Sequence, residues 1–267
     1  MNVRSRPWAA VAGLSIALAA SFTACGGDDD ESAADVTAAC EAHANVLAGF
    51  NTLFTVVPEP PEDGPPPPEF KGQLQSAYDA NIAAPVAQLV SSAPDEIKDE
   101  VDEIALKVKQ FRDDADPSAI DGDDFERLTG TVDAYLHENC SGPKADVKAV
   151  NYGYQGLPAT LPAGTVRIKL DNSTDEAHEI VILNRKPGVT ETYDQLLALP
   201  DDQAQAKLDF VDATSTDPGG TGYIVANLPA GDLVFMCSFG KGSTDDDDPK
   251  QEEPHFTLGM KQEVKVA

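Results

Sequence analysis

Basic residues are scarce in this chain of 267 residues. Its 19 lysines and arginines stand against 46 aspartates and glutamates, which gives a formal net charge of −27 at pH 7. A protein with this charge is repelled by phosphate backbones and by anionic lipid headgroups. The composition therefore argues against nucleic acid as a partner, and it predicts an acidic, well-solvated surface.

Long apolar runs are absent as well. The apolar stretch at residues 8–20 is too short to span a membrane. Arg4 and Arg6 precede it, and the small residues of "SFTAC" follow it. This order of charged, apolar and small residues is typical of an export signal, so the chain is expected to act outside the cytoplasm.

The "FTAC" motif, residues 22–25, resembles the lipobox of bacterial lipoproteins, in which the cysteine carries the lipid. The resemblance implies a signal peptide over residues 1–24, a lipidated Cys25 and a flexible tether over residues 25–35. The protein would then be anchored to the bacterial cell membrane. A plain cleaved signal, with Cys25 incidental, is the alternative. Because two of the 19 basic residues precede residue 25, the mature chain has 17 basic and 46 acidic residues and a formal net charge of −29.

Cysteine is also rare, with four in the chain and no C-x-x-C pair. If Cys25 carries lipid, an oxidising compartment favours a bridge between two of the other three. We expect this disulfide between Cys40, which begins the first helix of the predicted helical segment, and Cys140, which closes the last. Cys237 is then left as a single free thiol.

Two histidines leave an alternative open for the same cysteines. His43 lies one helical turn from Cys40, and His137 lies one turn from Cys140. These four residues could converge on zinc. The disulfide is favoured because thiols outside the cytoplasm tend to oxidise.

Residues 36–141 have helical periodicity and predict a helical bundle domain. Apolar residues recur along one face of each predicted helix, and such faces are buried when the helices pack together. The proline-rich segment 57–70 cannot lie inside a helix, because proline lacks the amide donor and clashes with the preceding turn. Four stretches carry the pattern: residues 36–54, 70–82, 97–111 and 125–136.

Residues 145–267 alternate instead, as half-buried strands do. In "GTVRIKL", Val166, Ile168 and Leu170 share one face of the strand. Short strands between Gly and Pro turn signals predict an antiparallel sandwich or barrel. A helical insertion at residues 190–210 interrupts the series and is expected to pack on the outside. The other strands predicted are "HEIVIL", "GYIVANL", "GDLVFMCSF" and "QEVKVA".

Four scarce side chains fall on these strands and on the turn before the last one. His178 has the parity of Ile180, and Cys237 has the parity of Phe235, so both point toward the apolar side. His255 and Met260 follow, before the last strand. Two imidazoles, a thiolate and a thioether are the ligand types of a blue copper centre, so we expect copper as the cofactor. A bound metal would also shield the unpaired thiol from oxidation.

The second half of the chain resembles the cupredoxin family of Greek-key β-sandwiches. The motifs that carry the resemblance are "LDNSTDEAHEIVIL", "LPAGDLVFMC" and "HFTLGM". They imply His178, Cys237 and His255 as equatorial ligands of copper, Met260 as the axial ligand, and a His255 that lies near the surface. The chain departs from the family by placing 17 residues between Cys237 and His255. The expected fold is α+β multidomain, with an N-terminal helical bundle followed by a cupredoxin-like sandwich.

No nucleophile paired with a base and no oxyanion hole can be recognised in the sequence, so an enzyme is not expected. The resemblance implies a membrane-anchored copper protein that transfers one electron at a time. The acidic "TDDDD" segment near the site would then attract a basic redox partner protein. A metal-free cupredoxin-like module that binds other molecules is the alternative; it predicts a hydrogen-bonded His178 and a free Cys237 thiol.

Overall fold

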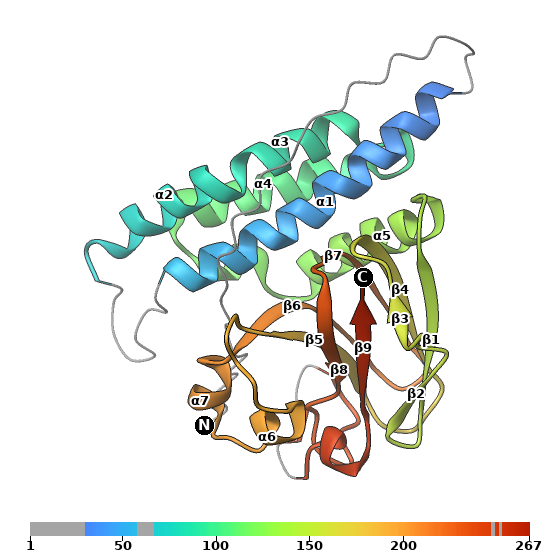
Figure 1. Cartoon of the computed structure of the whole chain (residues 1–267). Helices are drawn as coiled ribbons and strands as arrows, with labels where there is room; N and C mark the ends of the chain where they lie inside the picture. The colour runs from blue at the N-terminus through green and yellow to red at the C-terminus, as the bar shows by residue number, and fades with distance from the viewer. Residues whose placement is uncertain (1–29, 58–66, 247–248, 251–252) are drawn as a thin grey trace. The chain divides into compact units, whose positions relative to one another are not determined.

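The computed structural model describes residues 30–57, 67–246, 249–250 and 253–267. The expected signal peptide and Cys25 lie outside these residues. The chain forms two compact units that divide between Val132 and Asp133, within one helix. Figure 1 shows that the N-terminal unit is helical and that the C-terminal unit is built mainly of strands. None of the helices in the described part is both long and apolar enough to cross a membrane.

The helical unit contains amphipathic helices whose apolar faces pack together. In the described residues α1 contacts α2 and α3, and α4 packs against the same two helices. At Gly49 a Cβ atom would lie 2.4 Å from the carbonyl oxygen of Asn81, so glycine permits the close approach of α1 to the end of α2. The helices are α1 (Asp30–Val56), α2 (Phe70–Asn81), α3 (Ala83–Ser92), α4 (Lys98–Asp114) and α5 (Asp123–Asn139), with short 3-10 turns η1 (Asp95–Ile97) and η2 (Pro117–Ile120).

Two details of this unit differ from the sequence-based expectation. Helix α1 begins at Asp30, so the last residues of the expected tether, 30–35, are helical; their alanines favour that conformation. Helix α3 was not anticipated, and it follows α2 directly at Ile82. Pro85 lies in the first turn of α3, where the missing amide donor costs no helical hydrogen bond.

The second unit is a sandwich of two sheets, in the orders β2-β1-β4-β7 and β3-β9-β8-β5-β6. Two neighbouring pairs, β1 with β4 and β3 with β9, are parallel, whereas the other pairs are antiparallel. The architecture of a helical unit followed by a β-sandwich is as expected. The strands are β1 (Lys144–Val150), β2 (Gly153–Gln155), β3 (Thr160–Leu161), β4 (Gly164–Asn172), β5 (His178–Arg185), β6 (Leu208–Thr216), β7 (Thr221–Leu228), β8 (Gly231–Met236) and β9 (Lys261–Val266).

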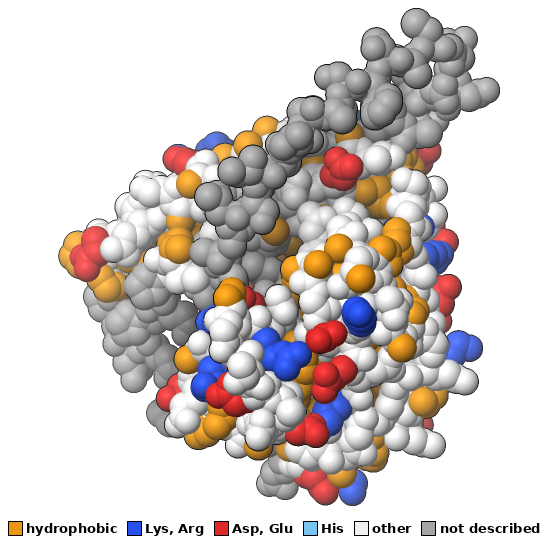
Figure 2. Space-filling view, in the orientation of Figure 1, with side chains coloured by type: hydrophobic (Ala, Val, Ile, Leu, Met, Phe, Trp, Pro, Cys, Tyr) orange, Lys and Arg blue, Asp and Glu red, His pale blue; other side chains and the backbone are white. Residues whose placement is uncertain are grey.

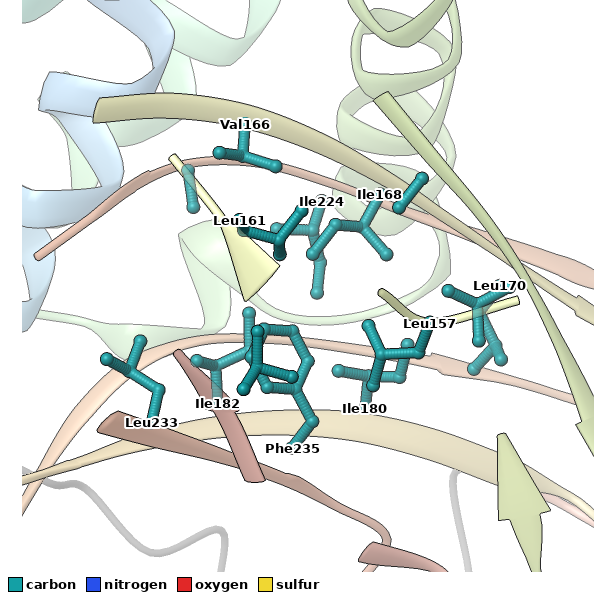
Figure 3. Close-up of a cluster of buried hydrophobic side chains, with 14 of the residues drawn as sticks. Leu157, Leu161, Val166, Ile168, Leu170, Ile180, Ile182, Ile224, Leu233 and Phe235 are labelled. Carbon is teal, nitrogen blue, oxygen red and sulfur yellow. The ribbon is translucent and has the colours of Figure 1, made fainter. Parts of the chain in front are cut away.

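The core of the sandwich is formed by the residues that alternation places inward. Val166, Ile168 and Leu170 on β4 are all buried, as predicted, and Figure 3 shows them facing side chains of the opposite sheet such as Ile180 and Phe235. A continuous apolar core of this kind leaves little freedom to the strand ends that border it. The core therefore fixes the positions of the residues at these strand ends.

Arg167 lies on the outer face of β4 and is nevertheless buried. Its guanidinium donates to the carbonyl oxygens of His137, at 2.6 Å, and Gly142, at 2.8 Å. The last turn of α5 thereby covers this face of the sheet, since the ring of His137 also contacts that of Tyr223. Burial lowers the pKa of Arg167 and of His137.

The helical insertion packs on the outer face of the second sheet. Helix α6 (Tyr193–Leu197) is capped by Thr192, and α7 (Asp201–Gln205) follows it. Their apolar side chains form a separate cluster with Val234 and Met236 of β8. The predicted insertion extended too far, because "LDF" at residues 208–210 already belongs to the edge strand β6.

Charged side chains of both signs cover the exterior. Figure 2 shows acidic residues interspersed with lysines and arginines over the sandwich. Ion pairs join several of them, such as Lys207 with Glu191 at 2.7 Å and Lys144 with Glu138 at 2.9 Å. Exposed pairs of this kind contribute little to stability and mainly keep the surface solvated.

The cysteines of the described chain differ in state. Cys40 and Cys140 are both disulfide-bonded, whereas Cys237 is a free, buried thiol. Disulfide-bonded sulfur atoms cannot act as zinc thiolates. The zinc alternative at His43 and His137 therefore loses its two sulfur ligands.

Candidate metal centre

Three of the predicted ligands converge at one end of the sandwich. His178 is the first residue of β5, Cys237 directly follows β8, and His255 opens the short 3-10 helix η3 (His255–Leu258). One ligand atom from each lies within 4.8 Å of the others. The two Nδ1 atoms are 3.2 Å apart, and Cys237 Sγ lies 3.3 Å from His255 Nδ1. All three side chains are buried.

The segment before His178 is fixed by Asn172, the last residue of β4. The Asn172 side-chain amide donates to the carbonyl oxygens of Glu176, at 2.8 Å, and Asp217, at 3.1 Å. Its Oδ1 accepts from the backbone and the hydroxyl of Thr174, which is an Asx-type turn. This turn determines where β5 begins and hence where the imidazole of His178 enters the site.

Backbone hydrogen bonds connect Cys237, His255 and Met260. The amide of Phe256 donates to the Cys237 carbonyl at 2.9 Å, and the amide of Cys237 donates to the Met260 carbonyl at 3.1 Å. The amide of Met260 donates to the His255 carbonyl at 2.9 Å. Met260 is fully buried in the same apolar cluster as Cys237. Its place beside the ligands agrees with the expectation, and its thioether as a fourth ligand stays a prediction.

The long segment between Cys237 and His255 returns to its starting point. Gly240 and Pro254 form an isolated antiparallel bridge, and the His255 amide donates to the Phe239 carbonyl at 2.8 Å. Further out, the Ser243 carbonyl accepts from the amide of Ala177 at 2.7 Å. The insertion therefore leaves both ligands at its base, because the entropic cost of closing a loop rises only slowly with its length.

His255 is held by a carboxylate that the sequence reasoning did not identify. Its Nε2 lies 3.0 Å from Glu176 Oε2, and its ring packs against that of Tyr152 with centroids 4.9 Å apart. If Nε2 carries the proton that Glu176 accepts, Nδ1 keeps its lone pair for a metal. The signal was present in "EAH", which places Glu176 two residues before His178. The implied surface position of His255 is wrong, since its side chain is 0 % exposed; Tyr152 and Glu176 cover it.

A second carboxylate lies close to Cys237. Glu179 Oε1 accepts from the amide of Ser238 at 2.6 Å and from the Ser238 hydroxyl at 2.5 Å. The Glu179 carbonyl oxygen accepts from the hydroxyl of Tyr154 at 2.6 Å. The side chain thus holds the residue after Cys237 and leaves the space between the three ligands to nitrogen and sulfur.

Burial controls the protonation of the site. It is the main reason that the pKa of His178 falls to about 4 and that the pKa of His255 is lowered. Both imidazoles are therefore neutral near pH 7, which is the form that binds metals. Burial, together with Glu179 and Glu176, raises the pKa of the Cys237 thiol. Although burial acts in the opposite sense, hydrogen bonds from Gly242, Tyr152 and His255 hold the pKa of Glu176 below its ordinary value.

This donor set fits copper. Two neutral imidazole nitrogens and one shielded sulfur face one another, whereas the other edge of the His255 ring points away, toward Glu176. A thiolate and two imidazoles with a nearby methionine are typical of copper sites of the blue type. The cysteine would lose its proton when a metal binds, because the thiolate is the ligand.

The described residues contain a second group of possible metal-binding side chains, which the sequence reasoning did not predict. Asp217, Asp245 and Asp246 place carboxylate oxygens within 4.8 Å of one another, and the first two are exposed. The amide of Asp246 donates to Asp217 at 2.9 Å, which accounts for their proximity. We assign this group no site.

The β-sandwich is cupredoxin-like in its two-sheet architecture. No protein-family model matches the chain, and no curated protein matches it. Among solved structures it is similar to dithionite-reduced auracyanin from Roseiflexus castenholzii, with 26% identity over 48% of this chain and 98% of that one, at a TM-score of 0.32.

Two further solved structures are similar over about the same share of the chain. Auracyanin A, a "blue" copper protein from Chloroflexus aurantiacus, shares 19% identity over 47% of this chain and 100% of that one, at a TM-score of 0.31. Rusticyanin from Thiobacillus ferrooxidans shares 19% identity over 48% of this chain and 80% of that one, at a TM-score of 0.29.

Proposed function

We propose that this protein binds copper through His178, Cys237 and His255, with Met260 as the axial ligand, and transfers single electrons. The observation that carries the proposal is the convergence of two Nδ1 atoms and one free thiol, each from a different segment of the chain, within 4.8 Å in a buried site. Any one of these residues alone would be ordinary in a protein core. Together they offer two neutral imidazole nitrogens and one sulfur atom, which are the donor atoms that a soft metal ion prefers.

Bound copper would supply a one-electron couple, and the protein's own part is to hold the ligands still. The hydrogen bonds among Cys237, His255 and Met260 and the Asn172 turn support such rigidity. Rigid ligands keep the reorganisation between two oxidation states small, which favours fast electron exchange. We assign the protein no catalytic residue and no enzymatic activity.

We further propose that the protein is extracytoplasmic and is anchored to the bacterial cell membrane through a lipidated Cys25. Its redox partner would be a basic protein, attracted by the acidic segment that begins at Asp245. Ser243, two residues earlier, hydrogen-bonds to Ala177 beside the site, so the segment starts close to the proposed copper. Such steering weakens as ionic strength rises, so partner reactions should slow in high salt.

Titration of the purified, metal-free protein with Cu(II) tests the proposal. One equivalent should produce an intense visible thiolate-to-copper band, and Cys237→Ser should abolish it. His43→Gln, which removes a buried histidine of the helical unit, is the matched control and should keep the band. A folded protein that gains neither colour nor tight copper binding would reject the copper function and leave a metal-free binding module as the better description.

A further inference from the structure

The ligand His255 is connected to the protein at both edges of its ring. Nδ1 faces the sulfur of Cys237 and the nitrogen of His178, whereas Nε2 faces the carboxylate of Glu176 at 3.0 Å. The ring is fully buried and packs against Tyr152. Because Nε2 is buried against the carboxylate, a proton on this nitrogen is favoured over one on Nδ1.

Glu176 is itself firmly held. Its Oε1 accepts from the hydroxyl of Tyr152 at 2.8 Å, its Oε2 accepts from the amide of Gly242 at 2.6 Å, and the same Oε2 lies 3.0 Å from Nε2 of His255. Its carbonyl oxygen accepts from the side chain of Asn172 at 2.8 Å. Two donors and the Nε2 edge of His255 thus face one carboxylate, and only 25% of the Glu176 side chain is exposed. This arrangement matches an anion, which accepts at both oxygens and donates at neither.

We infer that Glu176 is a positioning residue that sets the tautomer of His255 and tunes the reduction potential of the site. The inference rests on the copper-binding function proposed above. A carboxylate that accepts from the far edge of a ligand imidazole makes that ligand more basic, and its negative charge favours the more highly charged metal ion. Glu176 therefore stabilises Cu(II) relative to Cu(I) and lowers the potential.

A comparison of Glu176 with its neighbour Asp175 separates the effect of the bond to His255 from the general effect of a nearby negative charge. Asp175 precedes Glu176 and carries the same charge, but its side chain is exposed to solvent. Asp175→Asn therefore removes one negative charge near the site without changing a bond to His255. Glu176→Gln removes the charge and keeps the size and one acceptor oxygen, which can still receive the proton of Nε2.

Redox titration of the visible band measures the potential of the copper-loaded full-length protein. Glu176→Gln should weaken the preference for Cu(II) about tenfold, which corresponds to a rise of about 59 mV. Asp175→Asn should give less than half that shift, because solvent screens an exposed charge. Equal shifts in the two variants, or no shift in Glu176→Gln, would overturn the inference. Absence of the band from the wild-type protein would instead reject the copper function.

A measurement on the metal-free wild-type protein is independent of both copper and the folding of any variant. The 15N chemical shifts of His255 should identify Nε2 as the protonated nitrogen and Nδ1 as the unprotonated one at neutral pH. Protonation at Nδ1 would contradict the role of Glu176. In Glu176→Ala, where no acceptor remains, the two tautomers should become mixed.

Discussion

Replacing Asn172 by alanine should weaken both the sandwich and the copper site. The side chain is 3% exposed at the end of β4. Its amide serves the carbonyl oxygens of Glu176, Thr216 and Asp217, and its oxygen accepts twice from Thr174. Alanine removes all these bonds and leaves buried polar groups without partners.

The size of the effect follows from the number of bonds. With about four effective hydrogen bonds worth about 1 kcal/mol each, the free energy of unfolding should fall by about 4 kcal/mol. For a urea m-value of about 2 kcal/mol/M, the midpoint of unfolding should fall by about 2 M. Copper affinity should also fall, by about 10-fold to 100-fold, because the turn that presents His178 loses its support.

Urea unfolding of the metal-free protein, followed by tyrosine fluorescence and circular dichroism, measures the first effect. Competition with a copper chelator measures the second. Asn227→Ala is the matched control, since this asparagine is exposed on β7 and accepts from Thr165 at 2.7 Å; its cost should be about 0.5 kcal/mol or less. Equal costs at the two positions would refute the reasoning that Asn172 organises the site.

An aspartate at the same position separates the bonds to Thr174 from those to the carbonyl oxygens. Asn172→Asp keeps an acceptor for Thr174 but points a carboxylate at the carbonyl oxygens of Glu176 and Asp217. Near pH 7 it should therefore destabilise the protein at least as much as alanine does. A milder effect than that of alanine would show that the bonds to Thr174, rather than those to the carbonyls, carry the stability.

Three further predictions concern other parts of the sandwich. Met260→Leu should keep the copper band but raise the reduction potential in redox titration. Met236→Leu, on the outer face of β8, is the control and should leave the band and the potential unchanged. An equal shift of the potential in the two variants would exclude Met260 as the axial ligand. Arg167→Leu should lower the free energy of unfolding by roughly 2–5 kcal/mol, because the buried carbonyl oxygen of His137 and the carbonyl oxygen of Gly142 lose a charged donor. A change below about 1 kcal/mol in urea unfolding would contradict that role. Gly222→Ala should lower the free energy of unfolding by about 1–3 kcal/mol in the same assay, since the new Cβ would lie 2.4 Å from Thr214 Oγ1 and 2.9 Å from a backbone oxygen. An unchanged free energy of unfolding would mean that β6 and β7 separate easily.

Periodicity was sufficient to predict the two-part architecture. The alternation in β4 correctly placed Val166, Ile168 and Leu170 in the core, and helical spacing located most of the helices. Helix α3 and strand β6 were not predicted, for physical reasons. Helix α3 contains Pro85, which is typical of a helix break, and has a single buried residue, Leu89. Strand β6 is an edge strand with mixed burial, and its pattern is therefore weak.

The scarcity and order of His178, Cys237, His255 and Met260 were visible in the sequence, because these types carry chemistry whatever the fold. Strand parity also determined that His178 and Cys237 point inward. The environment of the site was not visible. Glu176 and Tyr152 cover His255, although they are 79 and 103 residues away from it along the chain.

The sequence by itself thus determined local properties: helix and strand periods, inward-facing residues and the kinds of ligand atom that the chain can offer. Tertiary structure alone decided that the 17-residue insertion returns His255 to Cys237, that His255 is covered rather than exposed, and that Glu176 reaches its far nitrogen. The physical reason is that periodicity depends on neighbours within a few residues. The distance between two ligands and the charge beside them depend instead on hydrogen bonds between segments that only the folded chain brings together.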